Sequence, residues 1–171
     1  PNVFAVESFM DELAHAAGAD PLAFRLANMQ ERPRHVAVLK QAAERAGWGQ
    51  PLPPGTALGI ATNQGYTSFI AVVARVTTVD GKARVEKLTC VVDCGLAVSP
   101  GGVEEQIYGG LMWGLGHALF DKLDIKQGRV VQSNFHDYRV ARMSDMPATD
   151  IVVLDGEPSK PCGVGELGSP S

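Results

Sequence analysis

Apolar side chains recur every three or four residues through the first fifty positions, which is the period of amphipathic helices. Each expected helix is bounded by residues that commonly start or stop one: a capping box, an acidic residue followed by proline, or a glycine. The pattern therefore predicts an N-terminal helical segment, residues 1–50. The first predicted helix is residues 8–17, with a weak capping box of Ser8 and Asp11 and a stop at Gly18. The second is begun by Asp20 and Pro21, and the third is residues 34–46, ended by Gly47.

β-Structure is expected from residue 57 onward, where β-branched residues become frequent. Residues 57–61 form a short apolar run, and residues 67–79 are rich in valine and threonine. Asp80 and Gly81 are a strong hairpin signal, and the chain returns through residues 83–93. The part of the chain from residue 57 onward therefore begins with paired strands.

The linker between these two patterns, residues 51–55, contains three prolines and a glycine. Such a stretch interrupts regular structure and is the best candidate boundary. It divides the chain into a helical segment, residues 1–50, and an α+β portion, residues 56–171. The expected fold class is α+β, an N-terminal helical segment followed by a mixed β-sheet with crossing helices.

Asp93 ends the predicted return strand, whose first residues are charged and whose residues 88–92 are apolar apart from one threonine. The strand therefore runs from solvent into the interior. A carboxylate at its buried end must be hydrogen-bonded or paired, because burying an uncompensated charge is costly. Asp93 either caps a backbone turn or contacts a ligand.

Residues 101–119 contain six glycines and still keep apolar residues at helical spacing. Each interior glycine destabilises a helix by about 1 kcal/mol relative to alanine, so the absence of side chains must serve another purpose. Either the helix packs closely against another backbone, or its bare face admits a large ligand. The apolar stripe is Val103, Ile107, Leu111 and Ala118, and the opposite stripe is Gln106, Gly110, Gly114 and His117.

The remainder of the chain predicts a hairpin around Gln127 and Gly128 and a strand over residues 150–154. The tail that follows is rich in glycine, proline and serine, and it ends in Gly163-Val164-Gly165-Glu166 and five further residues. The two glycines permit sharp backbone geometry and close approach to a partner. Glu166 is either a general base, if it faces a closed pocket, or an acidic residue in a mobile tail.

Composition excludes several function classes. The net charge of -4 argues against a nucleic-acid surface, and no apolar run approaches the roughly 20 residues of a membrane span. Cys90 and Cys94 are expected to be buried thiols, because zinc sites more usually show a tighter cysteine pair with two further ligands. The sequence indicates no metal ligands and does not identify the compartment, cytoplasmic or periplasmic.

Four stretches of this chain carry a resemblance to one family. They are FAVESFMDELAHAAGADPLAFRLANM, VVDCGLAVSPGGVEEQIYGGLMWGLGHALFD, VVQSNFHDYRVARMSDMP and GVGE. In this order they resemble the C-terminal part of the molybdenum-binding large subunit of the xanthine oxidase family, the molybdenum hydroxylases. The similarity is closest to isoquinoline 1-oxidoreductase beta subunits and bacterial aldehyde dehydrogenase large subunits. Because those subunits are several times longer, the chain is expected to be a piece of a larger polypeptide.

The resemblance implies roles for four residues. Glu166 matches the glutamate of the family's GVGE, the general base that deprotonates the molybdenum-bound hydroxyl or water. Gln106 matches the glutamine that contacts the pterin cofactor near the metal. Gly163 and Gly165 match the glycines of the same cofactor-binding loop. No residue of this chain is implied as a metal ligand.

The match is incomplete at two positions. Asp93 and Gly95 agree with the family's DCG, but Tyr108 stands where many members have glutamate and Ser99 where asparagine is usual. These departures affect the expected substrate branch more than the expected cofactor.

The implied reaction is hydroxylation of an aldehyde or an N-heterocycle with oxygen derived from water. The implied cofactor is molybdopterin, as molybdenum cytosine dinucleotide, with iron–sulfur clusters in a small partner subunit that removes two electrons. The isolated chain is expected to be inactive without the remainder of the large subunit. Two alternatives remain open: a non-catalytic structural or assembly module that retains the fold, and a binding domain with a self-contained pocket.

Overall fold

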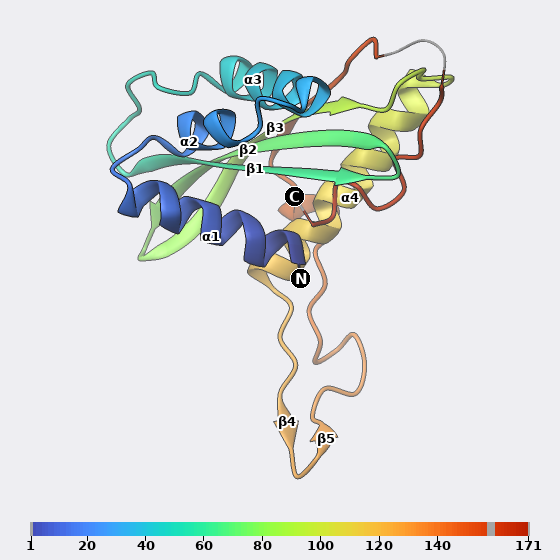
Figure 1. Cartoon of the computed structure of the whole chain (residues 1–171). Helices are drawn as coiled ribbons and strands as arrows, with labels where there is room; N and C mark the ends of the chain where they lie inside the picture. The colour runs from blue at the N-terminus through green and yellow to red at the C-terminus, as the bar shows by residue number, and fades with distance from the viewer. Residues whose placement is uncertain (1, 157–159, 171) are drawn as a thin grey trace.

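The computed structural model describes residues 2–156 and 160–170 and contains a four-stranded sheet with helices on both faces (Figure 1). Helix α3 packs on one face and α4 on the other, whereas α1 contacts α2 and strand β1. The predicted α+β class is confirmed. The elements are α1 (Asn2–Ala16), α2 (Pro21–Asn28), α3 (Pro33–Ala46), β1 (Thr56–Gly65), β2 (Ser68–Val79), β3 (Lys82–Asp93), α4 (Pro100–Leu119), β4 (Ile125–Lys126), β5 (Arg129–Val130), the 3-10 helix η1 (Met143–Asp145) and β6 (Ala148–Val153).

The sheet has the strand order β1-β2-β3-β6. Strands β1, β2 and β3 are antiparallel neighbours, whereas β6 pairs in parallel with β3 after the chain has crossed the sheet through α4. Successive residues of β2 point to opposite faces: Ala71 and Val73 pack under α3, and Ile70 and Val72 pack under α4. Because both faces are covered, residues 69–74 of β2 are all apolar and show no simple alternation.

The predicted helix boundaries in the N-terminal segment are largely confirmed. The Asp20 side chain accepts a hydrogen bond from the Ala23 N–H at the start of α2, and Gly47 ends α3 in the left-handed conformation with φ 73°. The predicted start of the first helix is wrong, because α1 already begins at Asn2. Ser8 therefore lies inside the helix and caps nothing.

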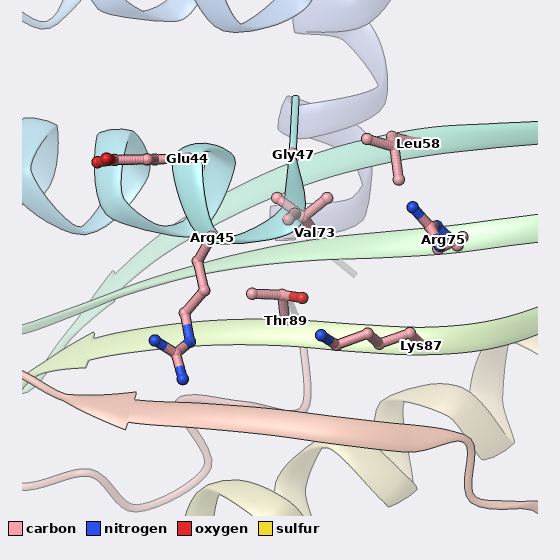
Figure 2. Close-up of a pocket in the computed structure, with 9 residues that line it drawn as sticks. Glu44, Arg45, Gly47, Leu58, Val73, Arg75, Lys87 and Thr89 are labelled. Carbon is pink, nitrogen blue, oxygen red and sulfur yellow. The ribbon is translucent and has the colours of Figure 1, made fainter. Parts of the chain in front are cut away.

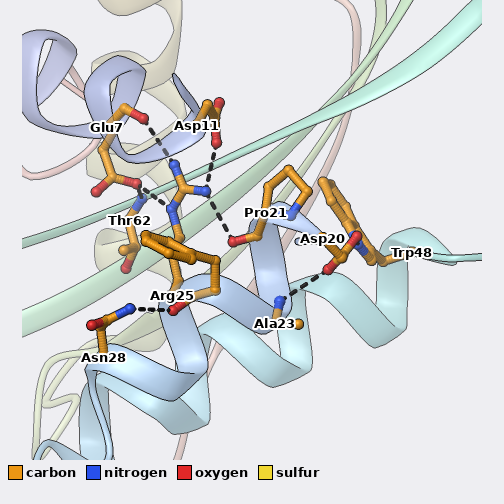
Figure 3. Close-up of polar contacts among 10 residues, drawn as sticks. Glu7, Asp11, Asp20, Pro21, Ala23, Arg25, Asn28, Trp48 and Thr62 are labelled. Atoms are coloured by element: carbon orange, nitrogen blue, oxygen red, sulfur yellow. Dashed lines mark hydrogen bonds and ion pairs between the residues drawn. The ribbon is translucent and has the colours of Figure 1, made fainter. Parts of the chain in front are cut away.

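Arg25 of α2 is completely buried and joins three elements (Figure 3). Its Nε donates to Glu7 Oε2 at 3.0 Å, and its Nη1 donates to Asp11 Oδ1 at 2.6 Å. Glu7 Oε2 also accepts the backbone N–H of Thr62 in β1 at 2.9 Å. Asp11, predicted as half of a capping box, is instead a partner of this arginine, and the network holds α1 against α2 and the sheet.

Two tight turns connect the first three strands. Asp80 and Gly81 have φ values of 51° and 73°, which confirms the predicted hairpin between β2 and β3. Tyr66 and Thr67 form the turn between β1 and β2 with φ values of 53° and 63°. Non-glycine residues rarely adopt two successive positive φ values, so this turn could not be inferred from residue type.

The chain between α4 and β6 extends away from the sheet as a long arm (Figure 1). Strands β4 and β5 pair near its tip, which confirms the hairpin predicted around Gln127 and Gly128. Among the described residues, no helix has the length and apolar character needed to cross a membrane.

Candidate functional site

Helix α4 and the C-terminal tail meet through the side chain of Gln106. Its Nε2 donates a hydrogen bond to the carbonyl oxygen of Gly165 at 2.6 Å. Gly165 immediately precedes Glu166, and both Gln106 and Glu166 are exposed. The structure therefore brings the predicted cofactor-contacting amide and the loop of the predicted base to the same place.

The loop at residues 163–166 is held on both sides. Ser68 Oγ, at the start of β2, donates to the Gly163 carbonyl at 2.8 Å. On the other side, Leu167 is 2% exposed and packs in the core between α4 and the sheet. Its backbone N–H donates to the Val164 carbonyl at 2.8 Å, which closes a turn. Glu166 thus sits on a backbone anchored to three elements and not in a detached tail.

Tyr66 supports this loop from the β1–β2 turn. A β-carbon added at Gly163 would lie 3.5 Å from Tyr66 Cβ, and one at Gly165 would lie 3.2 Å from Tyr66 Cε2. Gly165 also has a φ of +24°. The two glycines therefore let the loop lie flat against the tyrosine, a partner that the sequence did not indicate because the turn carrying Tyr66 was not predicted.

The backbone N–H groups of this loop are available to a ligand. Within residues 2–156 and 160–170, the N–H groups of Gly163, Gly165 and Glu166 donate to no acceptor. Gln106 Oε1 likewise accepts no hydrogen bond from the described part of the chain. Main-chain donors, an amide oxygen and a carboxylate in one small area suit a large heterocycle with several polar edges, so these residues fit a pterin.

The glycines of α4 answer the question left open by the sequence. A β-carbon at Gly110 would lie 3.2 Å from Gly168 Cα, and one at Gly114 would collide with the Ser169 carbonyl oxygen. The bare stripe therefore packs against the backbone of the chain's own tail, which is the first of the two alternatives. Ala118, expected on the apolar stripe, is exposed; the last buried residue of α4 is Gly116, whose added β-carbon would lie 3.4 Å from Ala141 Cβ.

Replacing Gly114 by alanine should lower the free energy of unfolding by about 1–3 kcal/mol, because the Ser169 backbone must move to admit a methyl group. Chemical denaturation followed by circular dichroism measures this. Gly109 of the same helix is the matched control, since nothing lies within 4 Å of its added β-carbon. Gly109→Ala should stabilise the helix by about 0.5–1 kcal/mol. Equal effects of the two substitutions would contradict the packing of α4 against the tail.

Asp93 is 4% exposed and is paired with Arg34 of α3. The guanidinium donates to both carboxylate oxygens, at 2.8 and 2.7 Å, and the Gly95 N–H donates to Oδ1 at 2.9 Å. The hydrogen bond from Arg34 holds the pKa of the Asp93 carboxyl below its ordinary value. Asp93 thus caps the turn after β3, as expected, and its arginine partner, 59 positions earlier, carried no signal in the sequence.

Two surface depressions lie away from this site. One of about 260 Å³ lies between the end of α3 and the sheet, with Arg45 and Lys87 among its lining residues (Figure 2). The other, of about 500 Å³, is open and is lined by Tyr108 and neighbouring residues of α4 and β6. Neither includes Gln106 or Glu166. Gln106 and Glu166 are both exposed on the surface of the described residues.

The chain matches the family model of the molybdopterin cofactor-binding domain over residues 7–147. It belongs to this family. The match includes Gln106 and ends before the loop at residues 163–166. The relatives below place this molybdopterin-binding domain among the large subunits of the xanthine oxidase family.

Curated relatives match almost the whole chain. The isoquinoline 1-oxidoreductase subunit beta of Brevundimonas diminuta is 34% identical, over 96% of this chain and 22% of the relative. A membrane-bound aldehyde dehydrogenase (pyrroloquinoline-quinone) of Gluconacetobacter polyoxogenes is 36% identical, over 97% of this chain and 24% of the relative. The chain thus spans about a quarter or less of these proteins.

Solved structures of molybdenum hydroxylases share the fold. Quinoline 2-oxidoreductase from Pseudomonas putida 86 aligns with a TM-score of 0.53 and 27% identity, over 61% of this chain and 14% of that one. Aldehyde oxidoreductase from Desulfovibrio gigas aligns with a TM-score of 0.50 and 32% identity, over 61% of this chain and 12% of that one. The molybdopterin-binding domain therefore has the architecture of known molybdenum enzymes.

Proposed function

We propose that this molybdopterin-binding domain acts in a molybdenum hydroxylase that oxidises an aldehyde or an N-heterocycle. The observation that carries the proposal is the hydrogen bond from Gln106 Nε2 to the Gly165 carbonyl. It brings the Gln106 side chain next to the loop that carries Glu166. The printed names of the relatives, which include isoquinoline, nicotinate and aldehyde enzymes, support this substrate class.

Each residue of the site has a distinct part in this proposal. Gln106 is oriented by its bond to Gly165, so that its Oε1 and its second N–H can pair with the edge of a pterin. The unbonded N–H groups of Gly163 and Gly165 would donate to acceptors of the same ligand. Glu166 would accept, on a carboxylate oxygen, the proton released as a water-derived oxygen attacks the substrate carbon. The residues of this chain would therefore contribute binding, orientation and proton transfer.

The molybdenum cofactor, when bound, would supply the two-electron oxidation of the substrate and the transfer of oxygen. We propose molybdenum cytosine dinucleotide as its form and a small iron–sulfur subunit as the exit for electrons. The exposed surface that carries Gln106 and Glu166 would be covered by the remainder of a large subunit. The relatives are four to five times as long as the part of them that this chain matches. The isolated domain should therefore be inactive.

The test is to purify the full-length protein that contains this domain, together with its partner subunit. Molybdenum and cytidine nucleotide content would be measured by mass spectrometry. Turnover would be compared for aldehydes and N-heterocycles in isotopically labelled water. We expect bound molybdenum and the label in the product. A molybdenum-free protein, or product oxygen that comes from molecular oxygen, would contradict the proposal.

The alternative is a non-catalytic assembly module. It would be favoured if Gln106 and Glu166 lay on different surfaces of the molecule. The Gln106 side chain on α4 is hydrogen-bonded to Gly165, the residue before Glu166, so this alternative is not favoured. A self-contained binding domain would need an enclosed pocket at these residues, and the depressions described above do not include them.

A further inference from the structure

The C-terminal tail forms a short antiparallel bridge with the chain just after β3. Gly95 pairs with Pro161, flanked by two backbone hydrogen bonds. The Leu96 N–H donates to the Lys160 carbonyl at 3.2 Å, and the Cys162 N–H donates to the Cys94 carbonyl at 2.9 Å. In this register Cys94 lies directly opposite Cys162.

Directly opposed residues of an antiparallel pair have Cα atoms about 4.5–5.5 Å apart. Disulfide bonds need Cα atoms about 4.4–6.8 Å apart, so residues in this register lie within the range that a disulfide can span. The Cys162 Sγ lies next to Gly95, 3.4 Å from where a β-carbon of residue 95 would be. It donates to the Lys160 carbonyl oxygen at 3.6 Å, and the thiol has to leave this contact and rotate toward Cys94 for the bond to form.

The two thiols differ in accessibility. Cys94 is 1% exposed, and burial raises the pKa of its thiol, with further contributions from Asp93 and Cys162. Cys162 is half-buried and lies by the Arg34 guanidinium, which interacts with it as well as with Asp93. The arrangement gives one accessible thiol and one buried resolving thiol.

We propose that Cys94 and Cys162 are a redox-active pair that forms a reversible intramolecular disulfide. The oxidant is a low-molecular-weight disulfide such as oxidised glutathione. The Cys162 thiolate attacks one of its sulfurs, and one glutathione thiolate leaves. Cys94 then loses its proton and attacks Cys162 Sγ, and the second glutathione thiolate leaves. Two protein thiols are oxidised and one glutathione disulfide is reduced to two thiols.

The bond would join the end of β3 to the residue that precedes Gly163. It would limit the movement of the loop that carries Glu166, and in an active enzyme it should lower turnover reversibly. This consequence rests on the proposed function, whereas formation of the bond does not. The cross-link would also close a long loop in the unfolded chain and should raise the melting temperature by roughly 5–10 °C.

The experiment incubates the reduced full-length protein with increasing ratios of oxidised to reduced glutathione. Remaining thiols are alkylated, and digested peptides are mapped by mass spectrometry. Cys90 is the internal control, because it is completely buried and burial raises the pKa of its thiol to about 12. We expect a peptide cross-linked through Cys94 and Cys162, and the cross-link should be lost on reduction with dithiothreitol. Under native conditions Cys90 should be recovered as a thiol.

Two variants separate the pair from a general sensitivity to oxidation. Cys162→Ala should abolish the cross-link and the rise in melting temperature, whereas Cys90→Ala should retain both. Thiols that stay unlinked at every ratio, a stable glutathione adduct at Cys162, or pairing through Cys90 would each overturn the proposal. If the protein shows no hydroxylase turnover but the cross-link forms, the proposed function fails and the redox pair stands.

Discussion

Replacing Glu166 by glutamine should lower kcat by roughly 10²–10⁴-fold and leave the molybdenum content unchanged. Glutamine has the shape of glutamate but is neutral at its side-chain end and cannot accept the proton. The loop itself should not move, because its anchors are the Ser68 bond to Gly163, the Gln106 bond to Gly165 and the buried Leu167. Steady-state kinetics of the full-length enzyme, with metal analysis of the same preparation, measures both quantities.

Glu104→Gln provides the control for this experiment. Glu104 is exposed on α4 and lines the open depression that excludes Glu166. The same loss of charge at this position should leave kcat almost unchanged. A Glu166→Gln enzyme with near-normal kcat would remove Glu166 from the proposed mechanism. A variant that lost its molybdenum would instead show that Glu166 acts in cofactor retention.

Replacing Arg25 by methionine should lower the free energy of unfolding by about 3–5 kcal/mol. The guanidinium is fully buried and makes hydrogen bonds to Glu7, to Asp11 and to the Pro21 carbonyl. Methionine can fill part of the volume but leaves the Glu7 carboxylate, whose side chain is only 13% exposed, without its positive partner. Urea denaturation, followed by fluorescence and circular dichroism, gives the change.

Arg45→Met is the matched control, because Arg45 is likewise an arginine paired with a carboxylate, and its Nε and Nη2 donate to the two oxygens of Asp150. Its side chain is 51% exposed, so water replaces the lost partner and the change should be far smaller. Similar effects of the two substitutions would show that burial of Arg25 does not determine the strength of the network. If proteolysis of the Arg25→Met protein increases within α1 alone, the lost stability comes from the packing of α1 against α2 and the sheet.

Burial, with a smaller contribution from the charge of Arg32, also sets the state of His35, a buried residue of α3. Its Nε2 is 2.6 Å from Thr62 Oγ1, and Thr62 in turn donates to the Ile70 carbonyl. Nε2 must therefore carry the proton and Nδ1 the lone pair, and Nδ1 has no partner within the described residues. Burial lowers the pKa of His35 to about 4, so the ring is neutral near pH 7.

Local sequence determined most of the elements. The glycine at position 47 and the Asp80-Gly81 pair specify backbone conformations that few other residues adopt, so the end of α3 and the β2–β3 hairpin follow from residue type. The charged start and apolar end of β3 likewise predicted a buried Asp93, and capping of a turn was one of the two roles left open for it. The first helix was misplaced at its start, because residues 2–7 extend α1 through contacts of Glu7 with Arg25 that no local pattern shows.

The sequence by itself determined the family, the α+β class and the candidates Gln106 and Glu166, since these depend on residue type and order. Tertiary structure decided what those residues contact. Gly110 and Gly114 of α4 pack on Gly168 and Ser169, and Gln106 reaches Gly165 across 59 positions. The sequence does not show such contacts, because only folding brings residues that are distant in the chain close enough to pack or to form a hydrogen bond. The tail therefore packs against the glycine-rich helix, and this packing positions the loop that carries Glu166.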